Sequence, residues 1–216
     1  KKTTFFYIVS VLILTTVLFV FYANSQKAIA SNERMMHAQR VIGKSHDVLL
    51  DALNVETGFR GFLLTRDESF LEPFNAGQAK IYSDLDTLTS LTKDSPSHQT
   101  QIDALRRVSG ERVAFTQKYI DEQRQNELDD SDKFVIIEKG KVLTDQIKSS
   151  IASINKEELK LLKLKKAENE NSNQLSGFLF LLLLVFLIVI FMLVIIIVKN
   201  QNTKNNELET YTADQK

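Results

Sequence analysis

Two long runs without a charged residue constrain this chain more than any other feature. "FFYIVSVLILTTVLFVFY" extends from Phe5 to Tyr22, and "LSGFLFLLLLVFLIVIFMLVIIIV" extends from Leu175 to Val198. A helix rises about 1.5 Å per residue, so about 20 apolar residues cross a hydrocarbon core of about 30 Å. Both runs are therefore predicted to be transmembrane helices, and the lipid bilayer is the first predicted partner of the chain.

Each run also has an alternative interpretation in which it is not a transmembrane helix of the mature protein. The first run follows Lys1 and Lys2 and precedes a small-residue triplet at Ala23, a pattern that resembles a cleaved signal peptide. Its apolar part exceeds the usual length of about 7–15 residues and ends in bulky aromatic residues, which favours an uncleaved anchor. The second run could be a buried helix, but a charge-free stretch of more than about 18 residues favours a span.

The lysines near the span ends predict the orientation. On the side of the termini stand Lys1, Lys2, Lys199 and Lys204, whereas the other ends have Lys27 and, farther away, Lys166. Because positive residues concentrate on the cytoplasmic side, we expect cytoplasmic termini and an external middle segment. The expected order is a cytoplasmic N-terminus (1–4), a span (5–22), an external segment (23–174), a span (175–198) and the start of a cytoplasmic linker (199–216).

Composition excludes some classes of function. The 216 residues carry no net charge and no basic stripe with interleaved aromatic residues, which argues against a nucleic-acid partner. The chain contains no cysteine, which fits an external segment without disulfides. The absence of cysteine also excludes a cysteine nucleophile, and the sequence contains no serine-based catalytic motif. We therefore expect no catalytic residues and no cofactor.

The hydrophobic period of the first half of the external segment predicts two helices. One helix ends near Leu64, and its apolar residues repeat at intervals of three and four: Val48, Ala52, Val55, Phe59 and Phe62. Thr65 and Glu68 have the spacing of a capping box and predict the start of the second helix, with Asp67 in its first turn. Pro73 is uncomfortable in that helix unless the cap lies farther along.

The second half predicts two more helices. Ser95 followed by Pro96 is a favoured helix start, and the helix after it carries Ile102, Leu105, Val108, Arg112, Phe115 and Tyr119 on one face. The polar stretch "QRQNELDDSDK" predicts the last reversal, with Asp129, Asp130 or Ser131 as possible caps. From Phe134 a helical period continues without a breaker into the second apolar run.

These four helices predict an all-α fold, an up-down-up-down four-helix bundle outside the membrane. An even number of helices returns the chain to the membrane that it left. The first and last helices are therefore expected to be continuous with the two transmembrane helices.

The stretch "ETGFRGFLLTRDESFLEPF" places unusual residues in a predicted helix. Glu56 and Arg60 are four residues apart, so they share a face and can form an ion pair. Gly58 and Gly61 each cost about 1 kcal/mol relative to alanine in a helix interior, which predicts close packing against another helix. Either this is a packing seam with an ion pair that fixes its register, or Glu56 and Arg60 bind a ligand.

The same stretch closely resembles the signature of the type-three CHASE domain, an extracellular sensory module of bacterial receptors. That signature runs approximately E-T-G-x-R-G-[FY]-L-L-T-x-[DN]-x-x-[FY]-L-x-P-[FY]. "EKGKVLTDQIKSSIASINKEELKLLKLKK" is similar to the segment of the family's last helix. The matched signature positions are Glu56, Thr57, Gly58, Arg60, Gly61, Asp145, Glu157 and Glu158. The chain departs from the family at two positions. The family more often has glycine in place of Arg66 and arginine in place of Lys148.

The resemblance implies a sensory input region of a receptor in the inner membrane of a bacterium, with the bundle in the periplasm or outside. It implies an unknown external stimulus, a homodimer, and a cytoplasmic output such as a histidine kinase or a diguanylate cyclase. Candidate sensing or register-setting residues are then Glu56, Thr57, Arg60, Asp145, Glu157 and Glu158. The tail after Val198 is too short for a catalytic domain, so this fragment itself is expected not to be an enzyme.

Two other functions compete with this hypothesis. A non-signalling adaptor or structural bundle would have the same helices, and an outer-face hydrolase would need a nucleophile that the sequence does not offer. His46, Asp47 and Asp51 have a weakly metal-like spacing, but one imidazole and two carboxylates on different faces predict a solvated helix instead of a metal site.

Overall fold

The computed structural model consists of helices joined by short connections. It describes residues 2–126 and 128–213, and the side chains of residues 11–126, 128–168, 170–204 and 206. The elements are α1 (Lys2–Thr65), the 3₁₀ helix η1 (Glu68–Leu71), α2 (Glu72–Leu91), α3 (Pro96–Gln125) and α4 (Asp130–Ala213). The predicted all-α class is confirmed. Residue 1 of the predicted N-terminal segment and residues 214–216 of the predicted linker lie outside the described residues.

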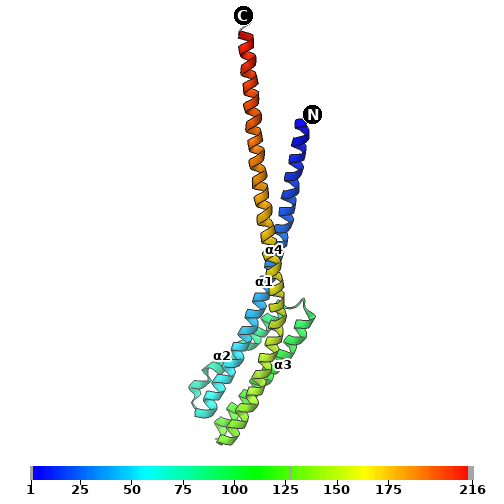
Figure 1. The fold of residues 1–216 in the computed structure, drawn as a ribbon. Coiled ribbons are helices and arrows are strands. Elements are labelled where there is room, and N and C mark those ends of the chain that lie inside the picture. The colour runs from blue at the N-terminus through cyan, green and yellow to red at the C-terminus, as the bar shows by residue number, and fades with distance from the viewer. Residues whose placement is uncertain (1, 127, 214–216) are drawn as a thin grey trace. The chain divides into compact units, whose positions relative to one another are not determined.

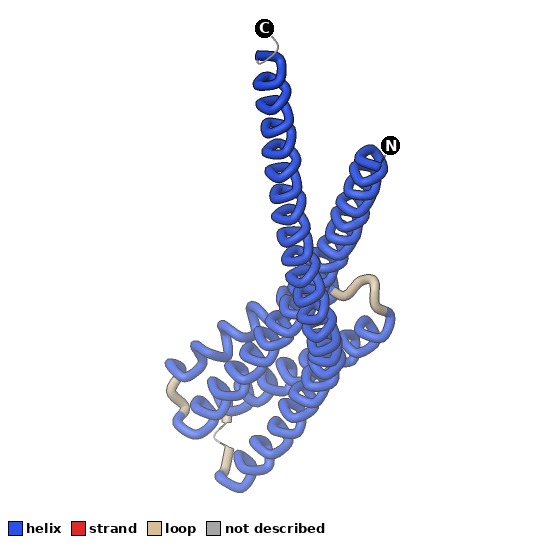
Figure 2. The backbone as a smooth tube through the Cα atoms, turned by 45° about the horizontal axis from the view of Figure 1, so that its top comes forward, coloured by secondary structure: helices blue, strands red, loops and turns tan. Residues whose placement is uncertain are grey.

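The chain divides into two units that share α1 and α4. One unit comprises Lys1–Asn32 and Ala167–Lys216, and the other comprises Glu33–Lys166. In the second unit, α2 and α3 lie alongside the adjoining parts of α1 and α4 (Figure 1). The connection from α2 to α3 is at one end of this bundle and the other two connections are at the opposite end (Figure 2). The predicted up-down-up-down bundle is therefore confirmed.

Apolar residues from all four helices form the core of the bundle. The predicted stripes supply most of them, and the fully or almost fully buried ones include Val48, Ala52, Val55, Phe59, Phe62, Phe74, Ile81, Leu85, Leu88, Ile102, Leu105, Ile147, Ile151 and Ile154. Burying one such side chain stabilises a fold by about 1.5–3 kcal/mol. The three-and-four spacing thus places one face of every helix in the same core.

The predicted capping box at Thr65 and Glu68 does not form. Thr65 is the last residue of α1, and its hydroxyl donates to the carbonyl of Gly61 at 2.8 Å. Glu68 instead pairs with Arg124 of α3, with an Nη2–Oε2 distance of 2.7 Å. The prediction was wrong because Thr65 still belongs to α1 and so cannot cap the next helix. The spacing of Thr65 and Glu68 does not show where the preceding helix ends.

The turn after α1 uses a left-handed residue. Arg66 has φ of 59°, and its N–H donates to the carbonyl of Phe62 at 2.8 Å, which closes the helix. The carboxylate of Asp67 then caps η1 by accepting from the N–H of Ser69 at 2.9 Å. Because α2 begins only at Glu72, Pro73 lies in its first turn, where a missing N–H costs little.

The other two reversals follow the sequence signals. Ser95 is the N-cap of α3, with Pro96 at the first helical position. The carboxylate of Asp129 accepts from the N–H of Asp132 at 2.8 Å at the start of α4. Ser95 and Asp129 are therefore confirmed as caps, and α4 continues without a break from Asp130 to Ala213, as predicted.

The unit that contains the ends of α1 and α4 carries the two apolar runs. Both helices include a stretch long and apolar enough to cross a membrane, and none of either stretch is buried within the described residues. Just beyond these runs the side chain of Asn24 donates to the carbonyl of Ser172 at 2.9 Å and accepts from its hydroxyl at 2.7 Å. Asn24 also donates to the hydroxyl of Ser176.

Candidate functional site

The Glu56 and Arg60 side chains form the ion pair that their spacing predicted. Glu56 Oε1 lies 2.7 Å from Arg60 Nη2, and the Glu56 side chain is 11% exposed whereas that of Arg60 is 40% exposed. The second carboxylate oxygen of Glu56 is buried and has no hydrogen-bond partner in the described structure. A buried acceptor without a donor costs free energy, so Glu56 is held in an incompletely satisfied position.

Gly58 and Gly61 permit the close approach of α1 to the start of the second helix. A Cβ on Gly58 would lie 2.6 Å from the backbone nitrogen of Phe74. A Cβ on Gly61 would lie 2.4 Å from the ring of Phe70. The close packing expected of these glycines therefore occurs within the same chain.

Arg112 lies in the centre of the bundle and is 1% exposed. Its guanidinium donates to the hydroxyl of Thr144 at 3.1 Å and to that of Thr116 at 2.5 Å. It also stands over the rings of Phe59 and Phe115, at 5.7 and 5.9 Å from their centroids. The sequence pattern placed Arg112 on an apolar stripe but gave no sign that it would be a buried charge.

The electrostatics of Arg112 involve the Glu56–Arg60 pair. Burial lowers the pKa of Arg112 from its ordinary value to about 10; the charge of Glu56 opposes this shift and that of Arg60 adds to it. Arg112 therefore stays charged at neutral pH, although no carboxylate in the described part of the chain lies at ion-pair distance from it. Buried charges are normally paired, so Glu56 has two candidate partners, Arg60 on its own helix and Arg112 on α3.

A second polar group joins the start of α3 to α4. His98 Nε2 lies 3.3 Å from Glu158 and 3.5 Å from Glu157. The amide of Gln101 donates to the Oε1 atom of Glu157 at 3.0 Å. His98 and Glu158 are both buried, and we call the group of His98, Gln101, Glu157 and Glu158 the His98 cluster.

The remaining signature residues lie elsewhere on the bundle surface. Asp145 is partly exposed and pairs with Lys141 at 2.6 Å and Lys148 at 3.3 Å, which lower its pKa. Thr57 is exposed on α1. Thr144, which contacts Arg112, is about 20 Å along α4 from Glu157 at 1.5 Å per residue. The structure thus divides the predicted site residues between at least two places.

A third polar group joins α1 to α2 and was not predicted. Asp51 and Asp84 are both buried, and Lys44 Nζ lies 3.2 Å from Asp84 and 2.7 Å from Asp47. Burial, followed by the charge of Asp84 and a hydrogen bond with it, raises the pKa of Asp51 from 3.8 to about 6. Within the described residues no group of three or more His, Cys, Asp or Glu side chains is arranged to hold a metal ion.

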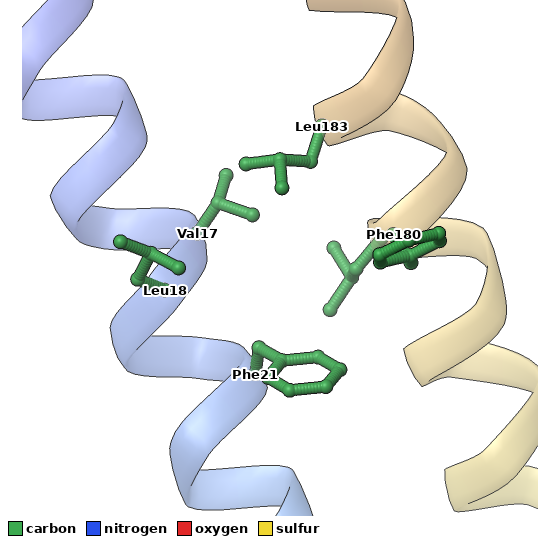
Figure 3. Close-up of a pocket in the computed structure, with 6 residues that line it drawn as sticks. Val17, Leu18, Phe21, Phe180 and Leu183 are labelled. Carbon is green, nitrogen blue, oxygen red and sulfur yellow. The ribbon is translucent and has the colours of Figure 1, made fainter. Parts of the chain in front are cut away.

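An apolar cleft separates the apolar stretches of α1 and α4 (Figure 3). Its lining consists of Val17, Leu18, Phe21, Leu179, Phe180 and Leu183. With no polar group in its lining, this cleft suits hydrocarbon such as a lipid chain and has no means of recognising a polar ligand.

The fold and the two apolar helices define a membrane protein with a helical bundle that contains buried charged groups. The CHASE3 domain matches residues 31–168, which cover the whole bundle, and the chain therefore belongs to the CHASE3 family. The bundle is accordingly the sensory domain of a membrane receptor, and its role is sensory and not catalytic.

Other comparisons add one structural relative. The sensor domain of the histidine kinase HK9 from Rhodopseudomonas palustris, solved by crystallography, is 24% identical, with a TM-score of 0.49 over 58% of this chain and 98% of that chain. A comparison with curated proteins gave no match.

Proposed function

We propose that this chain is the sensory input and transmembrane region of a bacterial sensor histidine kinase. The observation that carries the proposal is a CHASE3 domain placed between two apolar runs, with α4 continuous from that domain through the second run. A stimulus that prefers one packing of the bundle shifts an existing equilibrium by its difference in affinity for the two states. A slide, rotation or tilt of α4 then carries this shift to the cytoplasmic output.

The two packings of the bundle differ in how its buried charged groups pair. Glu56 pairs with Arg60 in the described structure, and a rearrangement that brings it to Arg112 would satisfy a second buried charge. Glu56 and Arg60 are therefore candidate sensing residues. Thr57, Asp145, Glu157 and Glu158 complete the proposed set of sensing or register-setting residues.

The receptor acts as a homodimer in this proposal, with a second copy of α1 as the partner surface. Met36, Leu50 and Leu64 are more than half exposed and are separated by fourteen residues, two heptads, along α1. In a coiled coil, residues that repeat every seven positions face the partner helix, so the α1 of a second copy can pack against these three residues. The termini are cytoplasmic and the bundle lies outside the inner membrane, as the flanking lysines predict.

Insertion of Gly-Pro between Asn171 and Ser172 tests transmission through α4. Residues 1–216 are fused to a cytoplasmic histidine kinase region, and Glu56→Gln is used in place of the unidentified stimulus. We expect Glu56→Gln to change autophosphorylation when α4 is intact and to have no effect after the insertion, because glycine and proline interrupt the helix.

A helical insertion of seven residues at the same place is the matched control, since it preserves the helix and nearly preserves its phase. It should retain the effect of Glu56→Gln. An equal effect of Glu56→Gln with the Gly-Pro insertion would exclude rigid transmission. No effect in any fusion would favour the adaptor hypothesis.

A further inference from the structure

The His98 cluster contains more acceptors than the described donors can satisfy. One carboxylate oxygen of Glu158 and the amide oxygen of Gln101 are buried without a hydrogen-bond partner. Glu158 is 5% exposed, and a second carboxylate, that of Glu157, shares the same imidazole. Two carboxylates at one partly buried place need a positive charge to be stable.

His98 is the group that can supply this charge. Its Nδ1 atom lies 2.8 Å from the hydroxyl oxygen of Ser95, to which it donates when the ring is protonated. Its Nε2 atom faces both glutamates. Nε2 is itself buried without a hydrogen-bond partner in the described structure, although both glutamates lie within 3.5 Å of it. An imidazolium would therefore supply the donor that this side of the ring lacks, once its geometry toward the glutamates adjusts.

The surroundings of His98 contain few other charges. The charged groups that contact it, among the described residues, are Glu157 and Glu158 from α4. Lys93 and Asp94 in the preceding connection are exposed, and the end of α2 contributes a carbonyl and a hydroxyl to Gln99. From α1, His37 Nε2 lies 2.8 Å from the carbonyl oxygen of Leu91, a contact that protonation would keep.

We propose that His98, Glu157 and Glu158 form a proton-binding site that fastens the start of α3 to α4 when the external medium becomes acidic. Histidine is the side chain whose ordinary charge change falls between about pH 5 and pH 8. Hydrogen bonds between charged groups are about twice as strong as neutral ones, so protonation tightens this seam. The functional consequence rests on the proposed receptor function, because Glu158 belongs to the same helix as the second span.

Thermal unfolding of the full chain in lipid nanodiscs tests the site. The midpoint is measured by circular dichroism at about pH 8 and about pH 5.5, the range in which histidine changes charge. We expect the midpoint to rise on acidification, and His98→Gln and Glu158→Gln each to remove about 3 °C or more of that rise. His46→Gln, which changes an exposed histidine of α1, should keep the full rise.

Nuclear magnetic resonance of ¹³C-labelled histidine provides a second test, which observes the imidazole of His98 directly in the folded wild-type chain. The resonance that is missing in His98→Gln should shift on acidification, and Glu158→Gln should alter that shift. An unchanged resonance overturns the proposal, as does an equal midpoint rise in His98→Gln and His46→Gln.

Zinc chloride at constant pH separates a proton from a metal ion. A midpoint that rises with zinc only when His98 is present, and does not rise with acid, would assign the site to a metal and overturn the proposal. Failure of the proton site would leave the fusion experiments with Glu56→Gln unaffected, so the two proposals fail independently.

Discussion

Asp51 and Asp84 show how a single buried pair links this bundle to pH. A Cβ on Gly77 of α2 would lie 2.4 Å from the carbonyl oxygen of Asp51, so α1 and α2 pack closely beside this pair. Lys44 contacts Asp84, whereas one oxygen of Asp51 is buried without a partner. Burial and the neighbouring charge of Asp84 therefore favour the protonated form of Asp51 and raise its pKa.

Asp51→Asn should reduce the pH dependence of stability. A folded-state pKa raised from 3.8 to about 6 gives a contribution that is complete below about pH 4 and is lost as the pH rises through about 6. Between about pH 5 and pH 8 this loss amounts to about 1 kcal/mol of the unfolding free energy. Urea unfolding at these two pH values should show a smaller difference for Asp51→Asn than for the wild type.

Asp103→Asn is the control for this prediction, because Asp103 is an exposed carboxylate on α3. It should keep the wild-type difference between the two pH values. The same difference in Asp51→Asn as in the wild type would show that Asp51 is ionised in the folded chain throughout this range.

At the scale of the helices, glycine decides how closely α1 and α2 pack. Gly58 faces backbone atoms of the second helix and Gly61 faces the Phe70 ring, so the two positions differ in how far the neighbour can yield. Backbone in a helix cannot move aside without moving the helix. The signature glycines are thus explained by packing inside one chain.

Gly58→Ala should destabilise the bundle by about 1–3 kcal/mol, because its methyl group would meet the Phe74 nitrogen at 2.6 Å. Gly110→Ala is the matched control on α3, where the nearest atom is the Tyr82 hydroxyl oxygen at 3.6 Å. It should raise stability by up to about 1 kcal/mol through helix propensity. Chemical unfolding of both variants measures the two effects, and equal changes would refute the packing explanation.

At the scale of the whole molecule, the orientation of the chain in the membrane decides which residues meet the stimulus. The proposed orientation places Asp103 outside and Asn202 in the cytoplasm. Because the chain has no native cysteine, a single cysteine reports one position without interference.

Asp103→Cys should react with a membrane-impermeant maleimide in intact cells, whereas Asn202→Cys should react only after permeabilisation. Both side chains are exposed, so burial does not distinguish them. Gel-shift detection of the label measures the reaction. Labelling of Asn202→Cys in intact cells would reverse the proposed orientation.

Local patterns in the sequence were enough to predict the helices, the bundle and the apolar runs. A spacing of three and four residues marks the helix face that avoids water, and a charge-free run marks a segment that avoids water on all sides. It also placed Glu56 beside Arg60, since residues four apart on a helix are neighbours. The capping-box prediction was wrong because α1 ends in a left-handed turn at Arg66. The glycine that is frequent in the family at this position would adopt such a turn without strain.

The contacts between charged residues far apart in the sequence could not be predicted before the helices were packed together. Asp51 meets Asp84, and His98 meets Glu158, across different helices. The spacing placed Arg112 on a helical stripe, but its burial depends on the helices that pack around it. The rotation of each helix and its distance from its neighbours fix these contacts, and both depend on how all the side chains of the core pack together.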